Sequence, residues 1–269
     1  MIRAPRVLVP VGLGLNCEAE TAHAFRAAGA EVDLVHLTDL FAHRHTRRIA
    51  DYDVLAFIGG FAYGDHIGGG FVLATRVRAH LQDDLAALLS GGGLVIGICN
   101  GFQTLVRLGL LPGPDAGAPD FRPRAALTNN DRLGYRNAWV RVRAEAGSRC
   151  VWTRGIDLLD MPARHGEGKF LLESDAALAA LEERGQVAFR YVDGDGRRAA
   201  SWPANPNGSA RAVAGICDVS GRILGLMPHP EAFLTPWHHP DFRQQRQSLE
   251  QSEPAGLAVF RAGLEALTG

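Results

Sequence analysis

The stretch Gly-Ile-Cys-Asn-Gly-Phe-Gln, residues 97–103, decides the fold of this sequence. An unbroken apolar run, residues 94–98, ends at Cys99, and a helical pattern follows over residues 100–108. Glycines two positions before and after the cysteine permit a sharp turn from strand to helix, the G-x-C-x-G form of a nucleophile elbow. The first turn of a helix also stabilises negative charge, as a nucleophilic sulfur requires. We therefore predict that Cys99 is a nucleophile at the end of a strand.

Short apolar runs alternate with helical patterns in the first 110 residues. The predicted strands are residues 7–10, 32–37, 54–58 and 94–98, and the predicted helices are residues 18–28, a long helix within 71–90, and 100–108. Apolar strands that alternate with helices are typical of a parallel sheet covered on both faces. The first half of the chain therefore predicts a parallel α/β sheet.

The pattern changes after residue 110, where prolines mark a loop region. The strands predicted beyond it are residues 139–143, 169–172 and 187–192, a hairpin of residues 212–218 and 222–227, and the helices are residues 175–184 and 256–267. We predict one α/β domain over residues 1–269, with a mainly parallel central sheet flanked by helices. An antiparallel extension belongs to its C-terminal half.

Composition narrows the class of protein. The 269 residues are 46 % hydrophobic and 21 % charged, with a net charge of −1, which excludes a disordered or fibrous chain. The 28 basic residues are matched by 29 acidic ones, so no nucleic-acid partner is expected. No apolar run approaches the roughly 18 residues of a membrane span, and no signal peptide is evident. We expect a soluble, cytoplasmic protein with no membrane partner.

Metal and cofactor sites find no support in the sequence. Its four cysteines include no C-x-x-C pair, so Cys17, Cys150 and Cys217 are interpreted as small buried apolar residues. Lys169 is the sole lysine, and its surroundings lack the first glycine and the final Ser or Thr of a phosphate-binding loop. The G-x-G at residues 12–14 has no third glycine and is interpreted as a simple turn. We predict no metal and no cofactor in this chain.

A base for the nucleophile is found far downstream. His229 and Glu231 follow the apolar run of residues 222–227 in a proline-bounded loop. Residues at i and i+2 of an extended segment share a face, so the carboxylate can orient the imidazole. Cys99, His229 and Glu231 are therefore the predicted triad. The glycine loop of residues 165–168, with its own histidine and glutamate, is as consistent with a plain turn as with a site.

A cysteine elbow followed by His-Pro-Glu resembles the class I (triad) glutamine amidotransferases. More specific segments resemble the glutaminase subunits of phosphoribosylformylglycinamidine synthases, in family order over nearly the whole chain. They are Asn16-Cys17, Gly-Gly-Phe-Ala-Tyr-Gly-Asp at 59–65, Asn130-Asp131, His-Gly-Glu-Gly at 165–168, Asn-Pro-Asn-Gly at 205–208 and Met-Pro-His-Pro-Glu at 227–231. The resemblance implies that Cys99 attacks the carboxamide of L-glutamine and forms a thioester, while His229 and Glu231 complete the triad.

The resemblance also implies the remaining site residues. The oxyanion would be held by the backbone amides of Gly60 and Asn100, and the elbow by itself also predicts the amide of Asn100. Gln103 and Phe61 are the candidate substrate-binding residues. Ammonia would pass to a large synthase subunit that binds ATP, Mg²⁺ and formylglycinamide ribonucleotide, and a small accessory subunit would join the complex.

The sequence departs from the family pattern in three segments, and other functions are also weighed. The loop at 12–17, the aromatic segment at 134–139 and the extra length at 236–254 differ from the family pattern, which bears on the partner and not on the triad. One alternative is an amidotransferase subunit that serves a different acceptor synthase. The other is a cysteine hydrolase of the α/β-hydrolase type, although that fold places its acid before the histidine. A non-catalytic relative would be expected to lose a triad residue, and all three are present.

Overall fold

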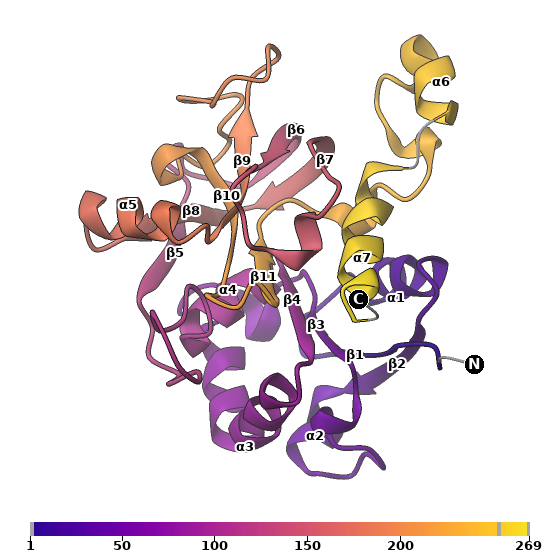
Figure 1. Cartoon of the computed structure of the whole chain (residues 1–269), viewed down its shortest axis with the longest axis vertical. Helices are drawn as coiled ribbons and strands as arrows, with labels where there is room; N and C mark the ends of the chain where they lie inside the picture. The colour runs from indigo at the N-terminus through magenta and orange to yellow at the C-terminus, as the bar shows by residue number, and fades with distance from the viewer. Residues whose placement is uncertain (1–2, 252–253, 268–269) are drawn as a thin grey trace.

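A nine-stranded mixed sheet forms the centre of the computed structural model, which describes residues 3–251 and 254–267 (Figure 1). The strand order is β2-β1-β3-β4-β11-β10-β9-β6-β7. The strands of this sheet are β1 Arg6–Val11, β2 Glu31–His36, β3 Val54–Phe57, β4 Leu94–Ile98, β6 Arg136–Ala144, β7 Leu158–His165, β9 Val187–Val192, β10 Val213–Cys217 and β11 Ile223–Leu226. Strands from both halves of the chain therefore share one sheet.

The first five strands in this order run parallel, as the alternating pattern predicts. Every residue of β3, β4 and β11 is buried, because helices cover both faces of this part of the sheet. The helices are α1 Glu18–Ala27, α2 Leu37–Phe41, α3 Phe71–Ser90, α4 Asn100–Leu108, α5 Asp175–Glu183, α6 Phe242–Gln251 and α7 Ala255–Glu265.

Two pairs of helices pack around the sheet (Figure 1). The first and last long helices, α1 and α7, pack together through Phe25 and Phe260, whose ring centroids lie 4.9 Å apart. The helices α3 and α4 pack together on the other side. None of the helices among the described residues combines the length and the apolar character needed to cross a membrane.

The predicted antiparallel extension is confirmed. The hairpin β10–β11 joins the extension to the parallel strands, and β9, β6 and β7 follow, each antiparallel to its neighbour. A separate two-stranded sheet pairs β5 Ala125–Asn129 with β8 Glu167–Leu172. The fold class is therefore the one expected from the sequence.

Four elements escape the sequence patterns: β5, β7, α2 and α6. The clearest case is β7, which contains Pro162 and therefore lacks the appearance of a strand. A proline is tolerated at the edge of a sheet, where its missing N–H breaks no ladder, and β7 is the last strand in the order. Helix α6 lies in the extra length at residues 236–254, for which the sequence predicts no element.

Candidate active site

The predicted elbow is present at the end of β4. Cys99 caps the N-terminus of α4 with φ +53° and ψ −105°, a strained conformation for a non-glycine residue. Neither elbow glycine has room for a side chain. A Cβ on Gly97 would lie 2.5 Å from Leu105 Cδ1, and one on Gly101 would lie 2.0 Å from the carbonyl oxygen of Phe57. Close packing of α4 on the sheet therefore imposes both glycines.

The histidine and glutamate lie beside the cysteine because β11 is the parallel neighbour of β4. Ile98 pairs with Leu226, so strands β4 and β11 end at the same edge of the sheet. The loop after β11 is held by a 2.7 Å hydrogen bond from the backbone N–H of His229 to the carbonyl of Pro162. The unpredicted edge strand β7 thus fixes the position of the predicted base.

A buried carboxylate orients the imidazole. Nδ1 of His229 lies 2.6 Å from Oε1 of Glu231, and the two side chains are 4 % and 1 % exposed. Burial by itself lowers the pKa of His229, but the charges of Glu231 and Cys99 outweigh it and raise this pKa well above its usual value. The second nitrogen, Nε2, makes no hydrogen bond among the described residues. The imidazole is therefore braced on one side and free on the other to exchange a proton.

Cys99, the predicted nucleophile, is enclosed but keeps a small exposed area. Cys99 is 6 % exposed, and its Sγ lies 3.4 Å from the carbonyl oxygen of Arg164, to which the thiol donates. Arg164 is near the end of β7, the same strand that holds the loop of His229. One edge strand of the antiparallel extension therefore contacts both the cysteine and the segment of its predicted base.

The two predicted oxyanion residues lie at the ends of adjacent strands. Gly60 follows β3, and Asn100 follows Cys99 at the end of β4, which pairs with β3. Gly60 has φ +142° and forms an isolated bridge with Leu15, and a Cβ there would lie 2.6 Å from Leu15 Cα. Only glycine fits this close approach. The structure thus places both residues at the sheet edge of Cys99, and their oxyanion role stays a prediction.

The side chain of Asn100 is held by a hydrogen-bond network with Asp65 and Gln103. Its amide Nδ2 donates to both oxygens of Asp65, at 3.0 and 3.1 Å, and to Oε1 of Gln103 at 3.0 Å. Gln103 in turn donates to the carbonyl of Glu167 at 2.7 Å, and the Glu167 carboxylate accepts from the N–H of Gly69 at 2.9 Å. Gln103 is buried and engaged at both ends of its amide, so it supports the elbow, and its contact with substrate stays a prediction.

Sequence reasoning assigned no role to Asp65, although it ends the Gly-Gly-Phe-Ala-Tyr-Gly-Asp segment. The pKa of this carboxyl is raised, because the effect of burial outweighs that of the hydrogen bonds from Asn100 and Gly70. The residue adopts φ +52° in a turn that also contains two glycines with positive φ, Gly64 and Gly68. The turn brings Asp65 under Asn100, which no spacing in the sequence reveals.

Two aromatic rings lie near the site. Phe61, a predicted substrate-binding residue, is 46 % exposed, and its ring centroid lies 6.1 Å from that of Tyr135. Burial raises the pKa of Tyr135, and the charge of Cys99 adds to this shift, which places the phenol near the nucleophile. Tyr135 belongs to the segment 134–139 that departs from the family pattern. The substrate contact of Phe61 stays a prediction.

The open question of the 165–168 loop is answered in part. His165 is 2 % exposed, its Nδ1 lies 3.1 Å from Oδ1 of Asn130, and burial together with the charge of His229 lowers its pKa to about 3. Asn130 also donates to the carbonyls of His165 and Gly134. Hydrogen bonds to Asn130 therefore hold this loop in place beside the predicted site, and its histidine is neutral.

Cys17 corrects a sequence-based interpretation. Cys150 and Cys217 are fully buried, as expected, but Cys17 is only partly buried. Its sulfur, a nitrogen of His229 and an oxygen of Glu231 all lie within 4.8 Å of one another. The same place is marked by Gly59, on which a Cβ would lie 3.0 Å from Cys17 Sγ and 2.8 Å from His229 Cε1. A long loop after β1 carries this thiol to the base, which sequence spacing does not show.

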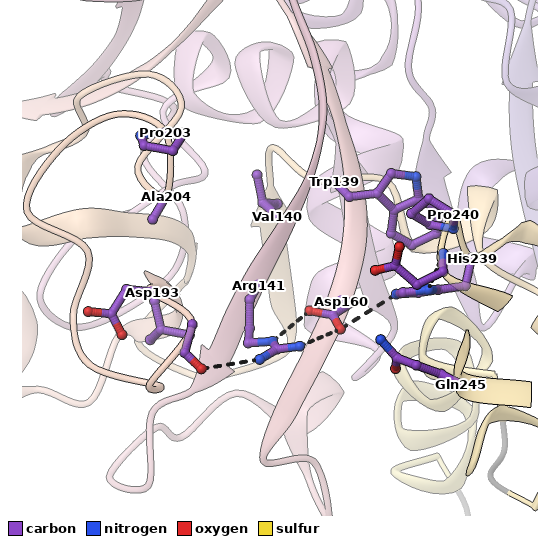
Figure 2. A pocket seen from close by; sticks show the side chains of 13 residues that line it. Trp139, Val140, Arg141, Asp160, Asp193, Pro203, Ala204, His239, Pro240 and Gln245 are labelled. Carbon is purple, nitrogen blue, oxygen red and sulfur yellow. Dashed lines mark hydrogen bonds and ion pairs between the residues drawn. The ribbon is translucent and has the colours of Figure 1, made fainter. Parts of the chain in front are cut away.

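A pocket of about 320 Å³ lies elsewhere, between β6, β7 and the segment before α6 (Figure 2). Its centre is Asp160, which accepts two hydrogen bonds from Arg141 at 2.8 and 2.9 Å and lies 3.7 Å from Nε2 of His239. None of the predicted site residues lines this pocket. This pocket is therefore distinct from the predicted site around Cys99.

Comparisons with known proteins agree with this geometry. Residues 4–265 match the CobB/CobQ-like glutamine amidotransferase domain. The phosphoribosylformylglycinamidine synthase subunit PurQ of Methanococcus maripaludis strain C5 is 41 % identical, over 97 % of this chain and 98 % of the relative. PurQ of Dehalococcoides mccartyi is 42 % identical, over 92 % of this chain and 91 % of the relative.

A solved structure is also similar. A chain in the structure of PurLQS from Thermotoga maritima superimposes with a TM-score of 0.72 and 28 % identity, over 98 % of this chain and all of that chain. The family match covers almost every residue, and the curated relatives exceed 40 % identity over nearly their full length. The chain therefore belongs to the CobB/CobQ-like glutamine amidotransferases and, within them, to the PurQ subunits of phosphoribosylformylglycinamidine synthase.

Proposed function

We propose that this chain is the glutaminase subunit of a phosphoribosylformylglycinamidine synthase and hydrolyses L-glutamine at Cys99. The observation that carries the proposal is the joint placement of three side chains. A sulfur on a strained elbow faces the same sheet edge as an imidazole, and a buried carboxylate holds that imidazole at 2.6 Å. This is the nucleophile, base and orienting acid that acyl transfer needs.

The first half-reaction makes the thioester. Cys99 gives its proton to His229, and the sulfur adds to the carboxamide carbon of glutamine. The backbone N–H groups of Gly60 and Asn100 stabilise the oxyanion. His229 then donates the proton to the departing nitrogen, the carbon–nitrogen bond breaks, and ammonia leaves. Glu231 keeps the proton on Nδ1 and stabilises the imidazolium.

The second half-reaction restores the enzyme. His229 takes a proton from water, and the hydroxide adds to the thioester carbon. The carbon–sulfur bond breaks, the sulfur regains its proton from His229, and glutamate leaves. The sum is glutamine plus water giving glutamate plus ammonia. Every proton transfer uses the nitrogen of His229 that has no hydrogen-bond partner among the described residues.

The acceptor chemistry belongs to other chains in this proposal. The Thermotoga maritima structure carries three named components, PurL, PurQ and PurS, in the designation PurLQS. By analogy, a large synthase subunit takes the ammonia and binds ATP, Mg²⁺ and formylglycinamide ribonucleotide, and a small accessory subunit completes the complex. The absence of a lysine-containing phosphate loop in the sequence supports this division. We place the complex in the cytoplasm.

Labelling tests the nucleophile directly. The full chain, alone and with its synthase subunit, is incubated with a glutamine-analogue electrophile, and the adduct is located by mass spectrometry. We expect one adduct, at Cys99, and protection by glutamine. An adduct at Cys17, or none with the partner present, would contradict the proposal.

Ammonia rescue separates chemistry from assembly. In the complex, Cys99→Ser is expected to abolish glutamine-dependent synthesis and to retain synthesis from added ammonia, because only the ammonia source is lost. Equal loss of both reactions would indicate failed assembly and would count against a glutaminase role for this residue.

A further inference from the structure

Cys17 supplies a second sulfur at the base of the active site, and the proposed hydrolysis does not use it. Its Sγ, a nitrogen of His229 and a carboxylate oxygen of Glu231 all lie within 4.8 Å of one another. We propose that these three side chains form a binding site for a thiophilic divalent cation of the zinc type, and that the bound ion switches the glutaminase off.

The donor set fits such an ion. One thiolate, one imidazole and one carboxylate are the three kinds of ligand that Zn²⁺ takes in proteins, at about 2.0–2.3 Å. Ligand atoms around a tetrahedral ion lie roughly 3.5 Å apart. The three side chains would therefore rearrange around an ion, because Nδ1 of His229 and Oε1 of Glu231 lie 2.6 Å apart and the sulfur lies within 4.8 Å of its partners. The three residues come from the loop before α1 and from the turn after β11, outside the strands of the sheet.

Two buried polar atoms near the site lack protein partners. Nε2 of His229 and Oε2 of Glu231 make no hydrogen bond among the described residues, although both side chains are more than nine-tenths buried. Buried polar groups are normally satisfied, so such atoms indicate a missing ligand or proton partner. The hydrolysis accounts for Nε2, which exchanges protons with sulfur and substrate. It does not account for the second oxygen of Glu231, which a cation would satisfy.

Two influences on the pKa of the Cys17 thiol oppose each other. Burial raises the pKa of Cys17, and its interaction with His229 opposes that shift. Cys17 also caps the N-terminus of α1, where backbone N–H groups favour a negative sulfur. A metal ion deprotonates a coordinating thiol outright, so binding releases this proton to solvent.

One of the three proposed ligands, Glu231, also lines a pocket. A pocket of about 630 Å³ opens onto Glu231 and is lined by the first turns of α1. Glu20, His23 and His238 line its wall and attract a cation, while Arg164 opposes it.

Inhibition follows from competition for the base. The ion would occupy a nitrogen of His229 and an oxygen of Glu231, which the hydrolysis needs to move and hold the proton. This consequence rests on the proposed function, whereas binding of the ion does not. The two are therefore tested by separate measurements on the full chain in thiol-free buffer.

Binding is measured first, with Cd²⁺ as the probe, through the ultraviolet charge-transfer absorption of its thiolate complexes. The Cys99→Ala variant removes the nucleophile as a ligand. We expect it to retain the Cd²⁺ absorption, and the Cys99→Ala/Cys17→Ala double variant to lose it. Cys99→Ala/Cys217→Ala is the matched control, since Cys217 is fully buried elsewhere, and it should retain the signal. Absorption that persists in the first double variant would overturn the site.

Inhibition is measured with Zn²⁺ on the chain in complex with its synthase subunit. Each variant is compared with its own rate in the presence of a chelator. In both Cys17→Ala and Cys17→Ser, the Zn²⁺ concentration for half-inhibition should rise about tenfold or more. Alanine removes one of the three ligands, and serine replaces the soft thiolate with a harder oxygen donor. Cys217→Ala should respond as the wild type does. Unchanged sensitivity in both Cys17 variants would refute the switch, even where Cd²⁺ binds.

Discussion

Two strand-to-helix junctions of the parallel sheet each end in a cysteine, and they differ in how the sulfur is held. Cys99 follows β4 directly, caps α4 and adopts φ +53°. Cys17 is separated from β1 by the loop at residues 12–16, caps α1 and adopts φ −111°. Neither makes a side-chain capping hydrogen bond. Both sulfurs lie close enough to influence the pKa of His229.

The two cysteines differ in backbone conformation. Gly97 and Gly101 allow α4 to press on the sheet, so the strained conformation of Cys99 is over-determined by its surroundings. Cys17 has an ordinary backbone conformation, and the loop before it is held by backbone hydrogen bonds from Asn16 to Gly59 and from Phe61 to Gly14. The strained elbow fixes the direction of the Cys99 sulfur, as attack along one direction requires. The roles proposed for the two sulfurs, a nucleophile and a metal ligand that share one base, follow this difference.

Removal of each sulfur is the strongest test of this comparison. Cys99→Ser should lower the glutaminase rate by about 10³-fold or more, because a serine hydroxyl is a poor substitute for the thiol nucleophile. Cys17→Ser should lower it by less than about tenfold, since no step of the hydrolysis uses that sulfur. Initial rates of glutamate release from the complex, without added metal, provide the measurement. Comparable losses in the two variants would erase the distinction.

The orienting acid is expected to have the next largest effect. Glu231→Gln retains the shape of the side chain but offers an amide where Nδ1 of His229 needs a carboxylate at 2.6 Å. The wrong tautomer then faces Cys99, and kcat should fall about 10²–10³-fold. Steady-state kinetics of glutamine hydrolysis measure it. Glu250→Gln, in an exposed pair with Arg246, is the control and should leave kcat unchanged.

A smaller effect is expected below the elbow. Asp65→Asn replaces an acceptor of two hydrogen bonds from Asn100 with a group that also donates, which disturbs the residue after the nucleophile. Because Asp65 acts through Asn100, we expect kcat to fall about 10–100-fold while KM changes little. Asp39→Asn, in the exposed pair with Arg44, is the control. A rise in KM at constant kcat would instead assign Asp65 to substrate binding.

The smallest effect concerns the free energy of unfolding and involves His165, which lies near the imidazole of His229. His165 stays neutral in the folded chain because its pKa is about 3, whereas in the unfolded chain it takes up a proton near pH 6.5. Its contribution is therefore present above pH 6.5 and is lost as the pH falls toward 3. By linkage, the wild type should lose about 2 kcal/mol more than His165→Gln between pH 7 and pH 5.

Denaturant unfolding of the two proteins at both pH values measures this difference. Arg44→Gln, which changes an exposed charge far from the site, serves as the control and should follow the wild type. If the wild type and His165→Gln lose equal stability on acidification, then His165 is protonated in the folded chain.

Local patterns were sufficient for the fold class and for the elements that carry the predicted triad residues. The apolar run before Cys99, the flanking glycines and the helix after them are local properties, and they are found at β4 and α4 as predicted. Alternation of strands and helices likewise predicted the parallel sheet. The edge strand β7 was missed because Pro162 breaks its local pattern, and an edge position that only the sheet defines makes the proline harmless.

The sequence by itself determined the α/β class, the elbow at Cys99 and the pair His229 and Glu231, because each is written in neighbouring residues. Only the tertiary structure decided what surrounds them. Asp65 lies under Asn100, and Cys17 lies beside His229, because strands distant along the chain end at one edge of the sheet. Strand order is set by long-range pairing and helix packing, which local spacing does not encode. A sulfur that the sequence presents as inert thereby lies beside the predicted base.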